Sequence, residues 1–163
     1  MSKPLERRAF LGIAGAGAAS LLLFGRSRSS AAGMRFAVNR APAEWRKLLG
    51  DQRYHILREA GTETAFTSPL NQEHRRGTFT CAGCALPLFS SATKFDSGTG
   101  WPSFWKALPG AVVTESDRSL LMVRTEVLCR RCGGHLGHVF DDGPRPTGLR
   151  YCMNGLALRF RPA

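Results

Sequence analysis

Residues 129–140 read CRRCGGHLGHVF, and the cysteines of this stretch indicate the class of fold. Cys129 and Cys132 form a CxxC pair, and the segment CAGC places a second pair at Cys81 and Cys84. Two such pairs supply four thiolates, the closed ligand set that is typical of structural zinc. We therefore expect these four cysteines to hold one structural zinc ion.

Three other interpretations of the paired cysteines stay open. The pairs could form disulfides, although loops of this size are uncommon as structural bridges. One pair could be a thioredoxin-like redox centre, but neither pair lies between a strand and a helix in a βαβ pattern. The third alternative is a zinc ribbon that binds nucleic acid.

Around the cysteine pairs, short apolar segments are broken by Gly, Pro, Ser and Asp, a texture that predicts short strands joined by turns. The expected turns are residues 108–111, 115–119 and 141–148, and the expected strands are residues 77–81, 86–89, 119–128, 134–140 and 150–160. The sequence thus predicts a mainly β domain of antiparallel sheets, stabilised by zinc, with a short helical lead-in at its N-terminal side.

The lead-in covers residues 42–61, where apolar residues recur at helical spacing in two short runs that end at Gly61. The first run places Trp45, Leu48 and Leu49 on one face. Residues 33–41 read as a loose linker, and the domain is expected to span residues 42–163.

Residues 1–32 have the features of an export signal. Arg7 and Arg8 precede a short, glycine-rich apolar run, and small residues follow it. This pattern resembles a twin-arginine signal, so we expect a periplasmic or exported protein that is free of the membrane after cleavage. An uncleaved membrane anchor is the alternative.

The chain of 163 residues carries a formal charge of +11. Removing residues 1–32 takes away five basic residues and one acidic residue, which leaves +7. A basic surface raises the question of nucleic acid. An export signal argues against nucleic acid as a partner. We expect the basic surface to be a solvated face and the protein to be a monomer.

Cys152 is the fifth cysteine and has no paired partner in the sequence. Arg150 lies two positions before it and Asn154 two positions after it, spacings that place all three on one face of a strand. Arg150 would favour a thiolate, and Asn154 could donate hydrogen bonds to an oxygen. His135 and His138 are candidate acids for such a thiolate, but they reach one site only if Gly137 bends or bulges the strand.

Four segments together resemble the B-type peptide-methionine (R)-S-oxide reductases. They are GTETAFTSPLN, FTCAGCALPLFSSATKFDSGTGWPSF, CRRCGGHLGHVFDDGPRPTGLRYCMN and ALRF, and the resemblance covers about residues 42–161. It implies that Cys152 attacks the sulfoxide sulfur and becomes a sulfenic acid.

The resemblance also implies roles for the residues around Cys152. Trp101 would pack against the substrate methyl group, and His135 and His138 would bind or protonate the sulfoxide oxygen. Asp142 would orient the histidines, and Asn154 would form a polar wall of the pocket. Arg150 is expected to line the same pocket.

Thr99 departs from the family pattern. Many members carry a second, resolving cysteine at this position, and this chain has a hydroxyl there. We therefore expect an external thiol reductant, such as a thioredoxin-like protein, besides oxidised proteins or peptides as substrates. The competing hypothesis is a zinc-stabilised basic β module that binds a partner without catalysis.

Overall fold

The computed structural model describes residues 36–119 and 122–163, so the expected export signal at residues 1–32 lies outside the described residues. The described elements are α1 (Pro42–Glu59), η1 (Pro69–Gln72), β1 (Gly77–Cys81), β2 (Pro87–Ser90), η2 (Ser91–Thr93), β3 (Lys94–Phe95), β4 (Ser103–Phe104), β5 (Val112–Asp117), β6 (Arg124–Cys129), β7 (His135–Phe140), β8 (Arg150–Met153), η4 (Gly155–Ala157) and β9 (Leu158–Pro162).

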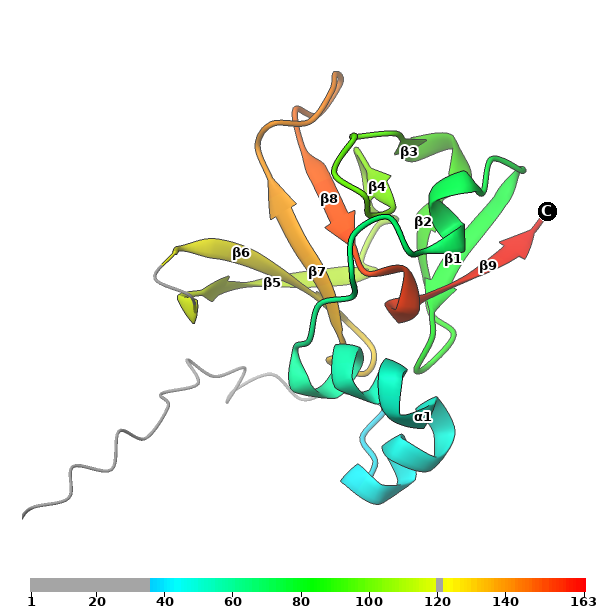
Figure 1. Ribbon diagram of the computed structural model, residues 1–163, viewed down its shortest axis with the longest axis vertical. Helices are drawn as coiled ribbons and strands as arrows, with labels where there is room; N and C mark the ends of the chain where they lie inside the picture. Colours follow the sequence, from blue (N-terminus) through cyan, green and yellow to red (C-terminus); the bar gives the residue numbers. More distant parts are fainter. Residues whose placement is uncertain (1–35, 120–121) are drawn as a thin grey trace, which may run out of the picture.

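The strands form two antiparallel sheets. One has the order β2-β1-β9, and the other has the order β3-β4-β8-β7-β6-β5. In Figure 1, β5 and β6 extend as a long hairpin away from the three-stranded sheet, and α1 lies across the end of the molecule. The prediction of a mainly β fold with antiparallel sheets and a helical lead-in is confirmed.

Aromatic side chains join the two sheets. Phe104 of β4 stacks on Phe89 of β2 with ring centroids 4.4 Å apart, and it meets Phe79 of β1 edge-on at 4.9 Å. All three rings are fully buried, as is Met153 at the end of β8. Burial of such large apolar side chains supplies most of the favourable free energy that holds the sheets together.

The helical lead-in is α1, which packs against β7 and η4. Pro42 opens the helix, and the Glu44 carboxylate accepts a hydrogen bond from the Ala41 N–H at 2.8 Å. Gly50, with φ of 69°, breaks the helix into two runs, as the sequence predicts. The expected face is only partly correct, because Leu48 is exposed while its neighbours Trp45 and Leu49 are buried.

The strand expected at residues 119–128 begins only at Arg124, the first residue of β6, and two further predictions of local structure are wrong. Residues 150–160 are two strands in different sheets, β8 and β9, because the backbone turns through η4 between them. Residues 115–117, expected in a turn, complete β5, which pairs with β6 from Val112↔Cys129 to Asp117↔Arg124. Polar residues are acceptable in β5 because it lies at the edge of the sheet.

The linker is anchored in its described part rather than loose. Val38 donates its N–H to the Arg131 carbonyl at 2.9 Å, and the Arg40 guanidinium lies 5.7 Å from the centre of the Trp45 ring. Within residues 36–119 and 122–163, no helix has the length and apolar character needed to cross a bilayer.

Candidate functional site

The four paired cysteines meet where the two sheets meet. Cys81 ends β1 and Cys129 ends β6, and each is followed by a tight turn that brings in the second cysteine of its pair. The four Sγ atoms all lie within 4.8 Å of one another. Two of the Sγ–Sγ distances are 3.7 Å for Cys81–Cys132 and 3.5 Å for Cys84–Cys129, too long for disulfide bonds of about 2.05 Å. The cluster has the geometry to hold a metal ion.

Cys152 lies on a central strand of the six-stranded sheet. In the antiparallel register it is opposite His138 of β7 on one side and Ser103 of β4 on the other. Residues directly opposite each other on neighbouring strands point to the same face of the sheet. The pairing of β7 with β8 therefore places a histidine beside the unpaired thiol.

A β-bulge in β7 brings the second histidine close to the first. Val127 of β6 pairs with Gly137 and Leu128 pairs with His135, so Leu136 is an extra residue in β7. The imidazole centroids of His135 and His138 are 5.5 Å apart. The bulge that the sequence requires is present.

Gly137 is required because the backbone of β8 lies close to it. Its φ is +153°, and a Cβ atom there would clash with the main-chain carbonyl of Cys152. Only glycine fits this approach without moving the strand that carries the thiol.

A small open pocket of about 120 Å³ lies beside Cys152. Its lining residues come from five separate segments of the chain and are Thr62, Trp101, Arg124, Gly137, His138, Phe140, Cys152 and Asn154. Of the two histidines, only His138 lines the pocket, and His135 lies behind it with 4% of its surface exposed. Trp101, His138, Cys152 and Asn154, which the sequence predicts as site residues, are thus brought together.

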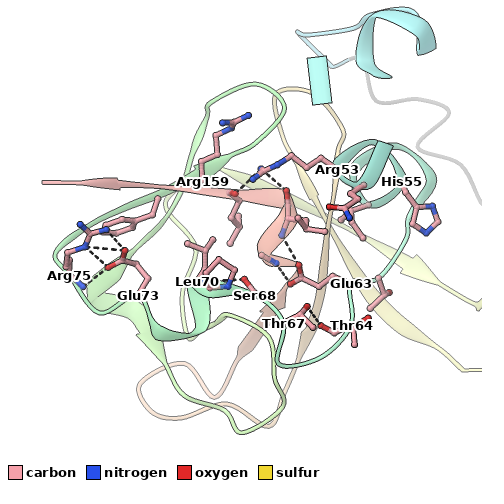
Figure 2. Close-up of a pocket in the computed structure, with 18 of the residues that line it drawn as sticks. Arg53, His55, Glu63, Thr64, Thr67, Ser68, Leu70, Glu73, Arg75 and Arg159 are labelled. Carbon is pink, nitrogen blue, oxygen red and sulfur yellow. Dashed lines mark hydrogen bonds and ion pairs between the residues drawn. The ribbon is translucent and has the colours of Figure 1, made fainter. Parts of the chain in front are cut away.

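Glu63 holds two of these residues in place. Its main-chain N–H donates to Asn154 Oδ1 at 3.0 Å, and its carbonyl accepts from Trp101 Nε1 at 3.1 Å. Its carboxylate accepts hydrogen bonds from the N–H groups of Gly155 and Leu156 (Figure 2). One buried residue therefore sets the orientation of the indole, the amide and the turn that follows Cys152.

The amide of Asn154 has one donor left for the pocket. Its Oδ1 is used by Glu63, and its Nδ2 donates one hydrogen to the Leu136 carbonyl at 3.3 Å. An amide nitrogen has two hydrogens, so the second can reach an oxygen bound in the pocket.

Asp142 does not orient the histidines, and this prediction is wrong. Its carboxylate forms two 2.8 Å hydrogen bonds with Arg150, which lies across the β7–β8 ladder from Phe140. Carboxylates of β6 and of β5, the strand beyond it, contact the histidines instead. Glu126 Oε1 lies 2.6 Å from His135 Nδ1, and Asp117 Oδ2 lies 2.9 Å from His138 Nε2.

Burial and hydrogen bonding set the charges around His138. Burial opposes ionisation of Asp117, but hydrogen bonds from Ser119, His138 and Arg124 outweigh it and lower the pKa of this carboxyl. Burial also lowers the pKa of His138, and this effect exceeds the opposing hydrogen bond from Asp117. At neutral pH we therefore assign an ionised Asp117 and a neutral His138, which donates its Nε2–H to the carboxylate.

Arg150, which was expected to line the pocket, is not among its lining residues, and it lies with Thr99 close to the Cys152 thiol. Hydrogen bonds to Asp142 raise the pKa of Arg150, and the charge of a Cys152 thiolate raises it further. The Arg150 guanidinium also lies 4.4 Å from the centre of the Phe140 ring. Thr99 Oγ1 is 3.7 Å from Cys152 Sγ. At the position where many family members carry a resolving cysteine, this chain therefore places a hydroxyl beside the thiol.

The sequence did not identify Glu63, Asp117, Glu126 and Arg124 as residues of the site. Glu63 lies inside the segment GTETAFTSPLN, where a glutamate among threonines was the available signal. Asp117, Glu126 and Arg124 reach the histidines through the β5–β6–β7 register, which no local pattern reveals.

Fold and site together define a β protein with a cluster of four cysteines that could hold a metal ion and a cysteine–histidine pocket. Residues 49–162 match the SelR domain family. A relative from Leptospira interrogans is 53% identical over 129 residues, 78% of this chain and 98% of the relative. Relatives from Agrobacterium fabrum and Thiobacillus denitrificans are 55% and 58% identical, over 77% and 74% of this chain and 93% and 92% of their own lengths.

All three relatives are named peptide methionine sulfoxide reductase MsrB. This chain belongs to the SelR-domain family of B-type methionine sulfoxide reductases. The resemblance seen in the four sequence segments is thereby confirmed for the family.

Proposed function

We propose that this protein reduces methionine R-sulfoxide in oxidised proteins or peptides, with Cys152 as the nucleophile. The observation that carries the proposal is the pairing of Cys152 with His138 across β7 and β8, in a pocket that also contains Trp101 and Asn154. Family membership supports the reaction class, and the pocket residues support the assignment of roles.

In the proposed first step, the Cys152 thiol and the sulfoxide give a thioether and a Cys152 sulfenic acid. The oxygen passes from the methionine sulfur to the cysteine sulfur, and the methionine sulfur gains two electrons. In its imidazolium form, His138 keeps Nε2–H on Asp117 and binds the oxygen, together with the free N–H of Asn154, through its second ring N–H, whose proton passes to the oxygen as the S–O bond breaks. The Trp101 indole packs against the methyl group.

The proposed second step uses external thiols. One thiol attacks the sulfenic acid, forms a mixed disulfide and releases water; a second thiol then releases Cys152 and leaves as a disulfide. No further cysteine lines the pocket, and the other four described cysteines are gathered in the metal cluster. An exposed thiol on a small molecule or on a thioredoxin-like partner would serve as reductant.

We propose that the ion of the four-cysteine cluster is zinc and that its role is structural. Zn–S bonds of about 2.3 Å place tetrahedral sulfurs about 3.8 Å apart, close to the 3.7 Å and 3.5 Å between two of the pairs. Four thiolates leave no open position on the ion, so it takes no part in the reaction. Atomic emission of the purified protein would identify the metal.

The function is tested with a peptide that contains either the R or the S epimer of methionine sulfoxide, with dithiothreitol as reductant. We expect consumption of the R epimer alone, no turnover by Cys152→Ser, and a loss of roughly 10²- to 10⁴-fold in His138→Ala. Equal rates on both epimers would contradict the proposal.

We also propose that residues 1–32 direct export through the twin-arginine route, on the basis of Arg7 and Arg8 before the apolar run. Fractionation of cells that express the full chain tests this proposal. Replacing both arginines by lysine should retain the protein in the cytoplasm, and an unchanged distribution would refute the proposed signal.

A further inference from the structure

A second, larger cavity adjoins the pocket of Cys152. It is an open groove of about 930 Å³ that runs between α1, residues 62–75 and the edge strand β9 (Figure 2), and we call it the β9 groove. Thr62 lines both the groove and the Cys152 pocket. Asn154 lines the pocket and Gly155, the next residue, lines the groove. A chain bound at Cys152 can therefore continue into the groove.

The two glutamates of the groove already have partners. The Glu63 carboxylate accepts the hydrogen bonds from Gly155 and Leu156, and Glu73 forms an ion pair with Arg75 at 2.6 Å. Both carboxylates are thus engaged in hydrogen bonds or an ion pair, and the negative charge of Glu63 also acts on the nearby Arg53.

Two arginines of the groove have no carboxylate partner in residues 36–119 and 122–163. They are Arg53 of α1 and Arg159 of β9. Arg53 donates from Nη1 to the carbonyls of Leu156 and Leu158, and in the described part of the chain these bonds leave its Nη2 and Nε without a partner. Arg159 is exposed along the same strand.

The two guanidinium groups repel each other. Burial lowers the pKa of Arg53 and the positive charge of Arg159 lowers it further, and together these effects exceed the opposing effect of the Glu63 charge. A carboxylate bound between them would offset this repulsion and could accept hydrogen bonds from both forks.

We propose that the β9 groove binds the polypeptide that flanks the oxidised methionine, and that Arg53 and Arg159 select a substrate with an acidic side chain there. This proposal rests on the proposed function, because it assigns a peptide substrate to the Cys152 pocket. An extended chain advances about 3.3 Å per residue, so an acidic residue a few positions from the methionine sulfoxide reaches the groove.

The proposal is tested with short alanine-based peptides that carry a central methionine R-sulfoxide. In one series aspartate replaces alanine at successive positions before and after the methionine sulfoxide, and in a second series lysine takes the same positions. The kcat/KM of each peptide is measured with the complete, metal-loaded protein. We expect aspartate on one side to raise kcat/KM by roughly 3- to 10-fold over alanine. The advantage should shrink in about 0.5 M salt because the charges are partly exposed.

Variants of single arginines distinguish binding of the acidic side chain in the β9 groove from a general electrostatic attraction between the basic protein and acidic peptides. Arg159→Ala should bring the aspartate-to-alanine ratio of kcat/KM close to one, and Arg159→Glu should invert it in favour of lysine. Arg161→Ala removes the same charge from the same strand outside the groove, so the ratio should stay at the wild-type value.

Two results would overturn the proposal. Equal kcat/KM values for all peptides would show that the groove does not contribute to substrate selection, while the reductase function would stand. A loss of discrimination in Arg161→Ala as large as in Arg159→Ala would lead to the same conclusion. If no peptide containing the R-sulfoxide is reduced at all, the proposed function fails and the groove proposal fails with it.

Discussion

At the scale of single residues, Thr99 determines how Cys152 can be recycled. Its hydroxyl lies 3.7 Å from Cys152 Sγ, and a hydroxyl cannot form a disulfide. The sulfenic acid should therefore persist until an external thiol arrives, so steady-state turnover should depend on the identity of the reductant.

Thr99→Cys should provide an internal resolving thiol. After a single turnover without reductant, mass spectrometry should show the loss of two hydrogens, whereas the wild type and Thr99→Ser should show one added oxygen on Cys152. A wild-type protein that instead forms a disulfide between Cys152 and one of the clustered cysteines would contradict both the recycling route and the four-thiolate metal site.

Asp117 controls the proton on His138. The carboxylate raises the pKa of His138 against the larger lowering by burial, so its removal should lower this pKa further. If the imidazolium is the acid, kcat/KM falls as pH rises above this pKa, and in Asp117→Asn the fall should begin at lower pH. At neutral pH we expect a loss of roughly 10- to 100-fold, part of what a positioned acid contributes.

The control for this experiment is Asp141→Asn, a change of an exposed carboxylate in the loop after β7. It should leave the pH profile in place. A profile that shifts equally in both variants would mean that general electrostatics, and not the contact with His138, sets the proton affinity.

Sequence patterns identified the residues of the site that lie near Cys152 in the chain or in a distinctive motif. The sequence patterns did not identify the carboxylate that contacts His138. Asp142 is close to His138 in the sequence, whereas Asp117 is close to it in space. The pairing of β5 with β6 and of β6 with β7 brings Asp117 within 2.9 Å of the ring. Such a register depends on tertiary packing, which a single sequence does not display.

At the scale of secondary-structure elements, the bulge in β7 links the fold to the site. The sequence indicates it only as a condition: two histidines at i and i+3 in a regular strand would point to opposite faces, so they come together only if the strand bends or bulges. The break between β8 and β9 was missed, because alternation of apolar residues continues across it and only the η4 turn separates the two sheets.

Gly137→Ala should therefore damage both stability and activity. The new Cβ would collide with the Cys152 carbonyl, and we expect the free energy of unfolding in urea to fall by about 3 kcal/mol or more. Gly148→Ala is the matched control, since Gly148 also has a positive φ, of +71°, but open space around it. That variant should lose about 1–2 kcal/mol, and equal losses in the two variants would show that steric contact with β8 is unimportant.

At the scale of the whole molecule, the cysteine cluster ties the two sheets together, since Cys81 belongs to the three-stranded sheet and Cys129 to the six-stranded sheet. A bound ion thus acts as a crosslink between distant parts of the chain. The clustering of the four thiolates was predictable from two CxxC pairs, whereas their position between the sheets was not.

Removal of the metal should weaken the whole domain. With a strong chelator, or in Cys81→Ser, we expect Tm to fall by roughly 10 °C or more, the shift that corresponds to about 3 kcal/mol in a domain of this size. Cys152→Ser makes the same substitution outside the cluster and should retain both the metal and the Tm. A metal-free protein with unchanged Tm and full activity would rule out a structural ion.

The complete burial of Met153 should protect its thioether from oxidation. A repair enzyme works where peroxide and hypochlorite oxidise thioethers, and its own methionines are exposed to the same damage. Met153 adjoins Cys152 in sequence but has 0% of its surface exposed, whereas Met122 between β5 and β6 is 52% exposed. On titration with hydrogen peroxide, peptide mapping should find sulfoxide at Met122 well before Met153, so the damage would fall on a surface side chain that another copy of the enzyme can reach and restore.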